Sequence, residues 1–189
     1  MRHSVISPDG TTIAFTYKGD IYTVPVAGGR AMQITTNPAY DTAPVWSPDS
    51  KRIAFASDRM GSLDVYIVAK DGGEPRRLTT HSGSETPLAF TDAGHVLFSA
   101  GIMPSAEAVV FPSNGQFNQV YRVSVEGGRP TMISSMPMEC ISINKEGAML
   151  YQDKKGYEDY WRKHHVSPIA RDICCLLYTS DAADERSSV

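Results

Sequence analysis

The sequence predicts an all-β protein, a partial β-propeller built from four-stranded antiparallel blades. Two nine-residue segments nearly coincide, SPDGTTIAF beginning at Ser7 and SPDSKRIAF beginning at Ser47. The residues that follow also match, so that Tyr22 and Tyr66 lie 44 positions apart. A period of about 40–45 residues with strand-like segments is typical of propeller blades. Because closed rings have about four to eight blades, we expect about three and a half blades of a six- or seven-bladed ring.

The predicted blades cover about 4–36, 43–80 and 87–135, and a partial fourth blade covers 139–173. The third copy matches less well and contains about a dozen extra residues around 101–117. Because this insertion is partly apolar, we expect it to pack on the propeller face or against another domain. A substrate-binding flap is the alternative.

Short apolar runs bounded by turn residues mark the second strand of each blade, at 13–15, 53–55 and 96–98. The third strands are β-branched and aromatic, as at 65–68 and 120–123. The repeats contain no convincing apolar pattern of helical period, so we expect strands throughout.

Each blade also carries turn signals. In Ser-Pro-Asp-Gly, the proline presets φ for the first corner of a type I turn, and the aspartate and glycine suit the next positions. A glycine pair supplies positive φ between the third and fourth strands. Each repeat ends with two small hydroxyl residues, threonine or serine, at the point where the outer strand leaves the blade. The predicted turn residues are Pro8, Asp9, Gly10, Pro48, Asp49, Gly28, Gly29, Gly72, Gly73, Gly127 and Gly128.

No catalytic residue is predicted for this chain. The motif Gly-x-Ser-x-Gly is absent from the sequence. Ser7 and Ser47 belong to turns, where we expect their hydroxyls to bond backbone amides. Asp58 is expected to cap a turn after the second strand of blade two, and Arg59 to pair across to a neighbouring blade.

Composition excludes several classes of partner. The 189 residues are 41% apolar and 21% charged, enough for one domain with a core. A net charge of −3 implies no broad basic face for nucleic acid. The sequence contains no run of about 18 apolar residues, which is the pattern that would predict a membrane span. The N-terminus lacks the apolar core of a secretory signal. Since a signal could have been lost upstream, both cytoplasmic and periplasmic locations stay open.

No metal and no cofactor is predicted. His164 and His165 are adjacent, and adjacent side chains on an extended segment point to opposite sides, so both cannot easily bind one ion. We expect one of them to pack or hydrogen-bond and the other to face water. The three cysteines, Cys140, Cys174 and Cys175, form neither a disulfide framework nor a metal-binding spacing.

The repeat pattern ends at Ile173, so we divide the chain into an incomplete propeller, 1–173, and a non-native or disordered tail, 174–189. The string CLLYTSDAADE, 175–185, resembles the translation of a transposase adapter used in sequencing libraries. A natural disordered tail is the alternative.

The repeat units SPDGTTIAF…GGRAMQITT and SPDSKRIAF…GGEPRRLTT resemble the WD-like propeller repeats of the TolB and tricorn type. That resemblance covers nearly all of 4–151. The segment DKKGYEDYWRKHHVSPIARDI, 153–173, together with the first blade, is similar to the N-terminal propeller of tricorn-like serine peptidases. In that family a PDZ-like module and the peptidase core follow the propellers. The resemblance therefore implies peptides, or those further domains, as partners, and it leaves homo-oligomeric assembly of the parent open.

The aromatic and charged part of that segment is the best candidate for contacts with a ligand. Aromatic side chains give rigid contact area, and arginine pairs with carboxylates, which suits a peptide-contacting loop. The alternative is a loop that docks this blade against another domain, with Trp161 as a buried anchor. The candidate residues are Tyr157, Tyr160, Trp161, Arg162, His164 and His165.

Two functions are consistent with the resemblance. In the first, the chain is the propeller of a tricorn-like serine peptidase, where it gates or orients peptide substrates without hydrolysing them. In the second, it is a TolB-like propeller that acts as a protein-binding module without enzymatic activity. A prolyl-oligopeptidase-like parent would require an α/β-hydrolase domain with Gly-x-Ser-x-Gly downstream.

Overall fold

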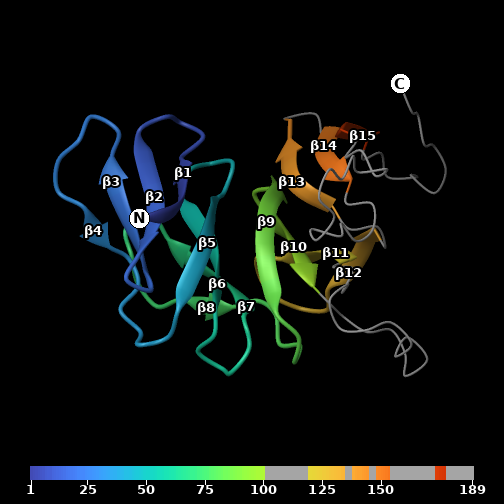
Figure 1. The fold of residues 1–189 in the computed structure, drawn as a ribbon, viewed down its shortest axis with the longest axis horizontal. Helices are drawn as coiled ribbons and strands as arrows, with labels where there is room; N and C mark the ends of the chain where they lie inside the picture. The colour runs from blue at the N-terminus through green and yellow to red at the C-terminus, as the bar shows by residue number, and fades with distance from the viewer. Residues whose placement is uncertain (101–118, 135–137, 145–147, 154–172, 178–189) are drawn as a thin grey trace, which may run out of the picture.

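A computed structural model describes residues 1–100, 119–134, 138–144, 148–153 and 173–177. Every regular element in these ranges is a β-strand, and the strands form four antiparallel sheets that stand side by side in chain order (Figure 1). The predicted all-β fold is therefore confirmed. In the described part of the chain, no helix has the length and apolarity needed to cross a membrane.

Consecutive strands pair with one another in every sheet, as expected for propeller blades. Blade one contains β1 (Arg2–Ile6), β2 (Thr12–Tyr17), β3 (Asp20–Pro25) and β4 (Met32–Gln33). Blade two contains β5 (Asp41–Trp46), β6 (Arg52–Ser57), β7 (Asp64–Ala69) and β8 (Arg76–Arg77). Blade three contains β9 (Glu85–Asp92), β10 (His95–Ala100), β11 (Gln119–Ser124) and β12 (Thr131–Ser134). Blade four contains β13 (Met138–Ile143), β14 (Ala148–Asp153) and β15 (Ile173–Leu177).

Strand β15 begins at Ile173 and extends into the segment 174–189, for which a tail was predicted. It pairs antiparallel with β14, with Cys175 opposite Leu150. The predicted boundary at residue 174 therefore falls inside a strand of the structure. Residues 178–189 lie outside the described ranges.

The Ser-Pro-Asp turns connect the first and second strands of blades one and two. In blade two, the Ser50 N–H donates to the Ser47 carbonyl at 2.9 Å, which closes the turn. The Ser47 hydroxyl accepts from the Arg52 N–H at 2.9 Å, and the hydroxyl of Ser7 accepts from Thr12 at 3.0 Å. The predicted bonds from these hydroxyls to backbone amides are confirmed. Gly10 has φ 72°, but the counterpart residue Ser50 also has positive φ, 57°, and is therefore strained.

The glycine pairs lie between the third and fourth strands, and all six of these glycines have positive φ. The closing hydroxyls act immediately afterwards. Thr35 Oγ1 accepts from the Ile21 N–H at 3.0 Å, and Thr79 Oγ1 accepts from the Val65 N–H at 2.9 Å. In blades one and two, the segment that follows the short outer strand is thus tied to the start of the third strand by a side-chain hydrogen bond.

The core consists of apolar layers between neighbouring blades. In β6, Ile53 and Phe55 face blade one, whereas Ala54, between them, faces blade three. This alternation follows from the strand period of two residues. A third layer joins blade three to blade four around Leu97 and Met149. Blade two is therefore covered on both faces, and its second and third strands are buried almost throughout.

We predict that Phe55→Ala lowers the free energy of unfolding by about 3–5 kcal/mol, because it removes a fully buried ring from the layer between blades one and two. Urea unfolding monitored by circular dichroism measures this loss. Met32→Ala on the outer strand β4 is the control, because Met32 is 54% exposed and its loss should change stability by about 0.5 kcal/mol or less. Equal effects of the two substitutions would contradict an inter-blade core.

Candidate functional site

The ligand-contact residues predicted from sequence lie in 154–172, outside the described residues. They are Tyr157, Tyr160, Trp161, Arg162, His164 and His165. Their contacts with peptides or with another domain stay predictions. The described residues instead show a row of acidic side chains at one end of the blades.

Four strands begin with an acidic residue: β3 with Asp20, β5 with Asp41, β7 with Asp64 and β9 with Glu85. Asp41 and Asp64 both pair in register with Ser57, so they lie at the same end of blade two. The Glu85 N–H donates to the Leu63 carbonyl, next to Asp64, at 2.6 Å. The acidic residues of blade two and the beginning of blade three therefore gather at one end of the sheets.

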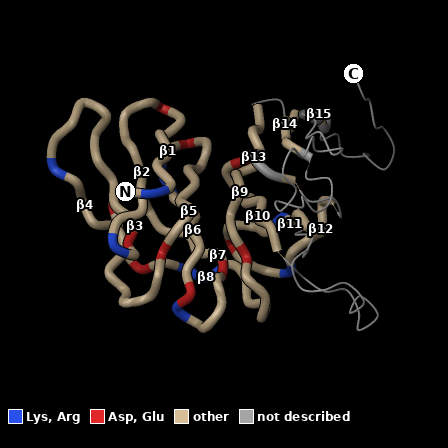
Figure 2. The backbone as a smooth tube through the Cα atoms, in the orientation of Figure 1, with Lys and Arg blue, Asp and Glu red and all other residues tan. Residues whose placement is uncertain are grey.

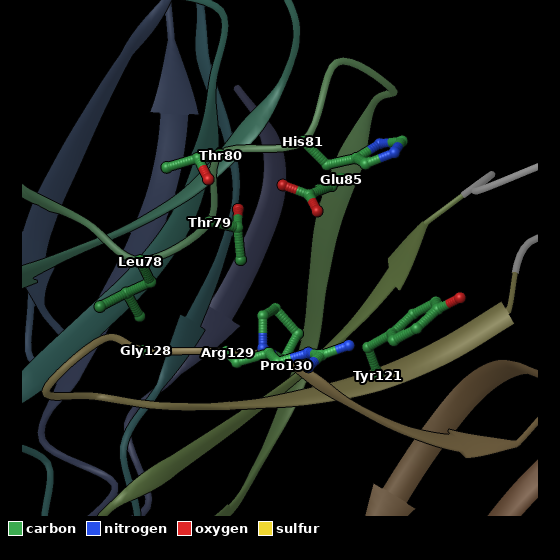
Figure 3. A pocket seen from close by; sticks show the side chains of 9 residues that line it. All are labelled: Leu78, Thr79, Thr80, His81, Glu85, Tyr121, Gly128, Arg129 and Pro130. Atoms are coloured by element: carbon green, nitrogen blue, oxygen red, sulfur yellow. The ribbon is translucent and has the colours of Figure 1, made fainter.

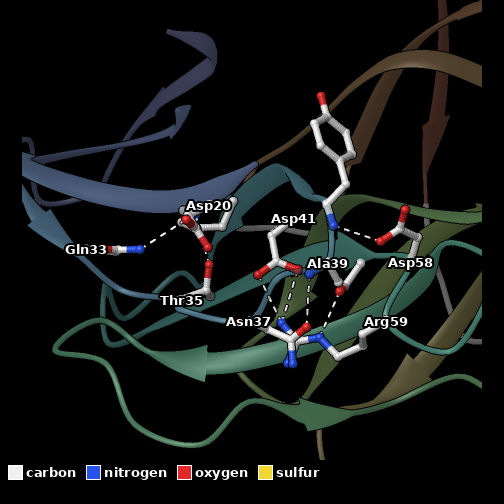
Figure 4. A network of polar contacts seen from close by, with 11 residues as sticks. Asp20, Gln33, Thr35, Asn37, Ala39, Asp41, Asp58 and Arg59 are labelled. Carbon is white, nitrogen blue, oxygen red and sulfur yellow. Dashed lines mark hydrogen bonds and ion pairs between the residues drawn. The ribbon is translucent and has the colours of Figure 1, made fainter. Parts of the chain in front are cut away.

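Arg59 neutralises Asp41. One guanidinium nitrogen lies 3.0 and 2.9 Å from the two carboxylate oxygens of Asp41, and Nε donates to Ser57 Oγ at 2.8 Å (Figure 4). The guanidinium carbon lies 4.6 Å from the ring centroid of Tyr66, close enough for a cation–π contact. The prediction that Arg59 pairs with a neighbouring blade was wrong, because Asp41 and Arg59 belong to the same blade. The turn residue Asp58 accepts from the Tyr40 N–H at 2.7 Å.

The acidic residues that begin the third strands have partners on the outer strands of their own blades. Asp64 is fully buried and forms an ion pair of 2.8 Å with Arg77. Burial raises the pKa of Asp64 above its usual value, and Arg77 opposes that change. In blade one, Asp20 accepts from the side-chain amide of Gln33 at 3.0 Å (Figure 4). Burial and the negative charge of Asp41 raise the pKa of Asp20.

Glu85 lines a pocket between blades two and three. The pocket has a volume of about 420 Å³. Figure 3 shows the Glu85 carboxylate between Thr79 and His81, with Tyr121 and Arg129 across the opening. The wall is formed by Leu78, Thr79, Thr80, His81, Glu85, Tyr121, Gly128, Arg129 and Pro130.

Glu85 is 1% exposed, and its Oε2 has no hydrogen-bond partner among the described residues. Burial raises its pKa to about 7, and the nearby charge of Asp64 adds to the increase. The Thr79 hydroxyl, the charge of Arg77 and the backbone N–H of His81 oppose it. Near neutral pH, the protonated and the ionised forms of this buried side chain are therefore both populated.

A sequence signal for this site existed. Asp20 and Asp64 lie 44 positions apart, and so do Asp41 and Glu85. Acidic residues that recur at the repeat period predict a common structural position. This spacing alone does not predict which of the acidic residues has a counter-ion. In the described part of the chain, no group of histidine, cysteine, aspartate and glutamate side chains could hold a metal ion.

The family model described as the tricorn protease N-terminal β-propeller domain matches residues 1–184. Tricorn protease homolog 1 of Streptomyces coelicolor is 36% identical over 91 residues, which are 48% of this chain and 8% of that protein.

Solved structures show the same fold. A structure assigned as TolB from Agrobacterium tumefaciens matches with a TM-score of 0.63 and 25% identity, over 82% of this chain and 54% of that one. The crystal structure of the tricorn protease matches with a TM-score of 0.58 and 14% identity, over 82% of this chain and 19% of that one. The chain thus spans less than two thirds of each of these three proteins.

We predict that Arg59→Met lowers the free energy of unfolding by about 3–5 kcal/mol, because it leaves the fully buried Asp41 carboxylate without its counter-ion. Adding Asp41→Asn to this variant should restore part of the loss, since the stranded charge is then removed. The control is Glu126→Gln, because Glu126 and Arg76 form an exposed pair whose loss costs about 0–1 kcal/mol. Urea unfolding of the three variants measures these differences, and equal costs for Arg59→Met and Glu126→Gln would contradict the assignment.

We predict that Glu85 makes the chain less stable as the pH rises. Its pKa is about 7 when folded and near 4.5 when unfolded, so between these values the folded chain binds the extra proton. Stability is therefore lost from about pH 4.5 to pH 7, by on the order of 3 kcal/mol.

The variant Glu85→Gln should lack this loss, so its stability relative to the unmodified chain should increase with pH. Urea unfolding at about pH 5 and about pH 8 measures the change. The variant Glu126→Gln, at an exposed position, is the matched control. A constant difference between Glu85→Gln and the unmodified chain across this range would show that Glu85 titrates normally.

Proposed function

We propose that this chain, which belongs to the family of tricorn protease N-terminal β-propeller domains, is the non-catalytic propeller of a serine peptidase and admits or orients its peptide substrates. The family match over residues 1–184 is the observation that carries the proposal. The chain spans only 8% of its Streptomyces relative, so hydrolysis would belong to other regions of the parent protein. A PDZ-like module and a peptidase core are the regions that the resemblance implies.

The arrangement of the strands supports an orienting role. The first strands of neighbouring blades contact one another, β1 with β5, β5 with β9 and β9 with β13. Strands that converge in this way lie nearest the axis of a propeller. A channel along that axis would be narrow, and a peptide would have to be extended to enter it.

The serine hydroxyls of the repeats support a scaffold role. The Ser47 hydroxyl donates to Asp49 at 2.6 Å and accepts from the Arg52 N–H, and Ser7 repeats both contacts with Asp9 and Thr12. Both hydroxyls are buried and serve their turns. Figure 2 shows basic and acidic positions intermixed along the described backbone, which suits varied peptides better than a polyanion.

A TolB-like role is the second candidate. The match to TolB from Agrobacterium tumefaciens, at 25% identity over 82% of this chain, favours it. A propeller of this kind would bind a folded protein partner through its loops and would need no peptidase region. The reading frame of the gene beyond this chain distinguishes the two candidates: a PDZ-like and serine-peptidase region supports the first, and termination after one propeller supports the second.

We predict that the purified chain binds unstructured peptides saturably but does not cleave them. Fluorescence anisotropy of a labelled peptide measures binding, and a fluorogenic version of the same peptide measures hydrolysis. The heat-denatured chain serves as the control for binding. Turnover above the buffer blank would contradict the non-catalytic assignment. Binding of folded proteins in preference to extended peptides would support the TolB-like role instead.

A further inference from the structure

Blade two contains a built site for one guanidinium group. The cation of Arg59 lies between the Asp41 carboxylate, at 2.9 Å, and the ring of Tyr66, at 4.6 Å from the centroid. Tyr66 is itself stacked on Phe55, with ring centroids 5.9 Å apart and an interplanar angle of 26°. A buried acid at one end and an aromatic face at the other bind a planar cation well.

Blade three repeats this arrangement around the pocket. Glu85 pairs in register with Ala100, just as Asp41 pairs with Ser57 in blade two. Tyr121 is stacked on Phe98 with a centroid distance of 5.7 Å and an interplanar angle of 24°. Glu85 and Tyr121, the counterparts of the two groups that hold Arg59, both line the pocket of about 420 Å³.

The cation of this arrangement has no counterpart in the blade-three sequence. Counting from the aligned phenylalanines Phe55 and Phe98, the position of Arg59 corresponds to Ile102. The whole insertion 101–117 contains no lysine, arginine or histidine. Arg129 lines the pocket, but no ion pair joins it to Glu85 within the described residues. The insertion therefore cannot supply the missing cation.

We propose that this pocket binds the arginine side chain of a peptide, with Glu85 as the counter-ion and the face of Tyr121 as the stacking surface. The inference rests on the proposed function for the source of the arginine, an extended peptide handled by the propeller. The chemistry of the pocket selects the ligand. A guanidinium can stack on a ring while it bonds a carboxylate, which an ammonium group does less well.

The test uses small probes, so that it does not depend on peptide handling. N-acetyl-arginine amide should bind saturably in isothermal titration calorimetry, and N-acetyl-lysine amide should bind several-fold more weakly. N-acetyl-citrulline amide has nearly the same shape without the charge, and should bind at least about tenfold more weakly than the arginine probe.

Proton release on binding of the arginine probe is a second measurement. It is not expected if Glu85 has only a structural role. The guanidinium favours the ionised carboxylate, and Glu85 has a pKa of about 7, so binding near pH 7 should release about half a proton. The binding enthalpy should then depend on the ionisation heat of the buffer. Asp64, Arg77 and His81 are the other groups that face Glu85.

Matched variants assign the site. Glu85→Gln should weaken the arginine probe at least about tenfold and abolish the proton release, whereas the exposed Glu126→Gln should change neither. Tyr121→Leu should weaken binding several-fold, while Tyr121→Phe keeps the ring and should bind normally. Arg129→Met removes a like charge from the wall and should strengthen binding. If Glu85→Gln does not fold, two comparisons still test the proposal: Tyr121→Leu against Tyr121→Phe, and the arginine probe against the citrulline probe.

Equal binding of the arginine and citrulline probes, or full affinity in a folded Glu85→Gln chain, would overturn this inference. Either result would leave peptide binding by the propeller intact, since extended peptides could be held elsewhere. Conversely, binding of the arginine probe without any binding of unstructured peptides would support the pocket and count against the proposed source of the arginine.

Discussion

The structure depends on the burial of apolar side chains between neighbouring blades. A four-stranded sheet whose strands are apolar on both faces cannot bury both faces within itself, so each blade needs a copy on either side. Blade two meets this requirement, with Phe55 toward blade one and Ala54 toward blade three. Fully burying a large apolar side chain contributes about 1.5–3 kcal/mol. The repeat in the sequence therefore reflects a requirement of packing.

Close packing of the blades also buries the ends of their strands, and this has consequences for the acidic residues there. Removal of a carboxylate from water is costly unless a counter-ion or hydrogen-bond donors compensate. Blade two compensates Asp41 with Arg59 and Asp64 with Arg77. Glu85 occupies the equivalent position in blade three without such an arginine, and burial raises its pKa to about 7. A scaffold position thereby becomes a chemically distinct pocket.

The contrast between blades two and three distinguishes repeated residues that maintain the fold from residues that are candidates for a function. The Ser-Pro-Asp turns, the glycine pairs and the closing threonines recur, and the structure uses them for backbone geometry and hydrogen bonds. Function is expected where a copy departs from the pattern, because packing alone does not require the departure. Blade three departs twice, by the insertion at 101–117 and by the absence of an arginine at the position that corresponds to Arg59.

The sequence by itself determined the strand order, the turns and the blade repeat, because these follow from local patterns of period two and from turn chemistry. It also placed Arg59 near an acidic residue, but in the wrong blade, since residues 18 positions apart meet only through strand pairing. The pocket at Glu85 was not predicted from the sequence. Only the tertiary structure decided it, because Tyr121 and Glu85, 36 positions apart, come to one pocket through strand pairing in blade three, and Leu78 and Thr79 of blade two form its other wall.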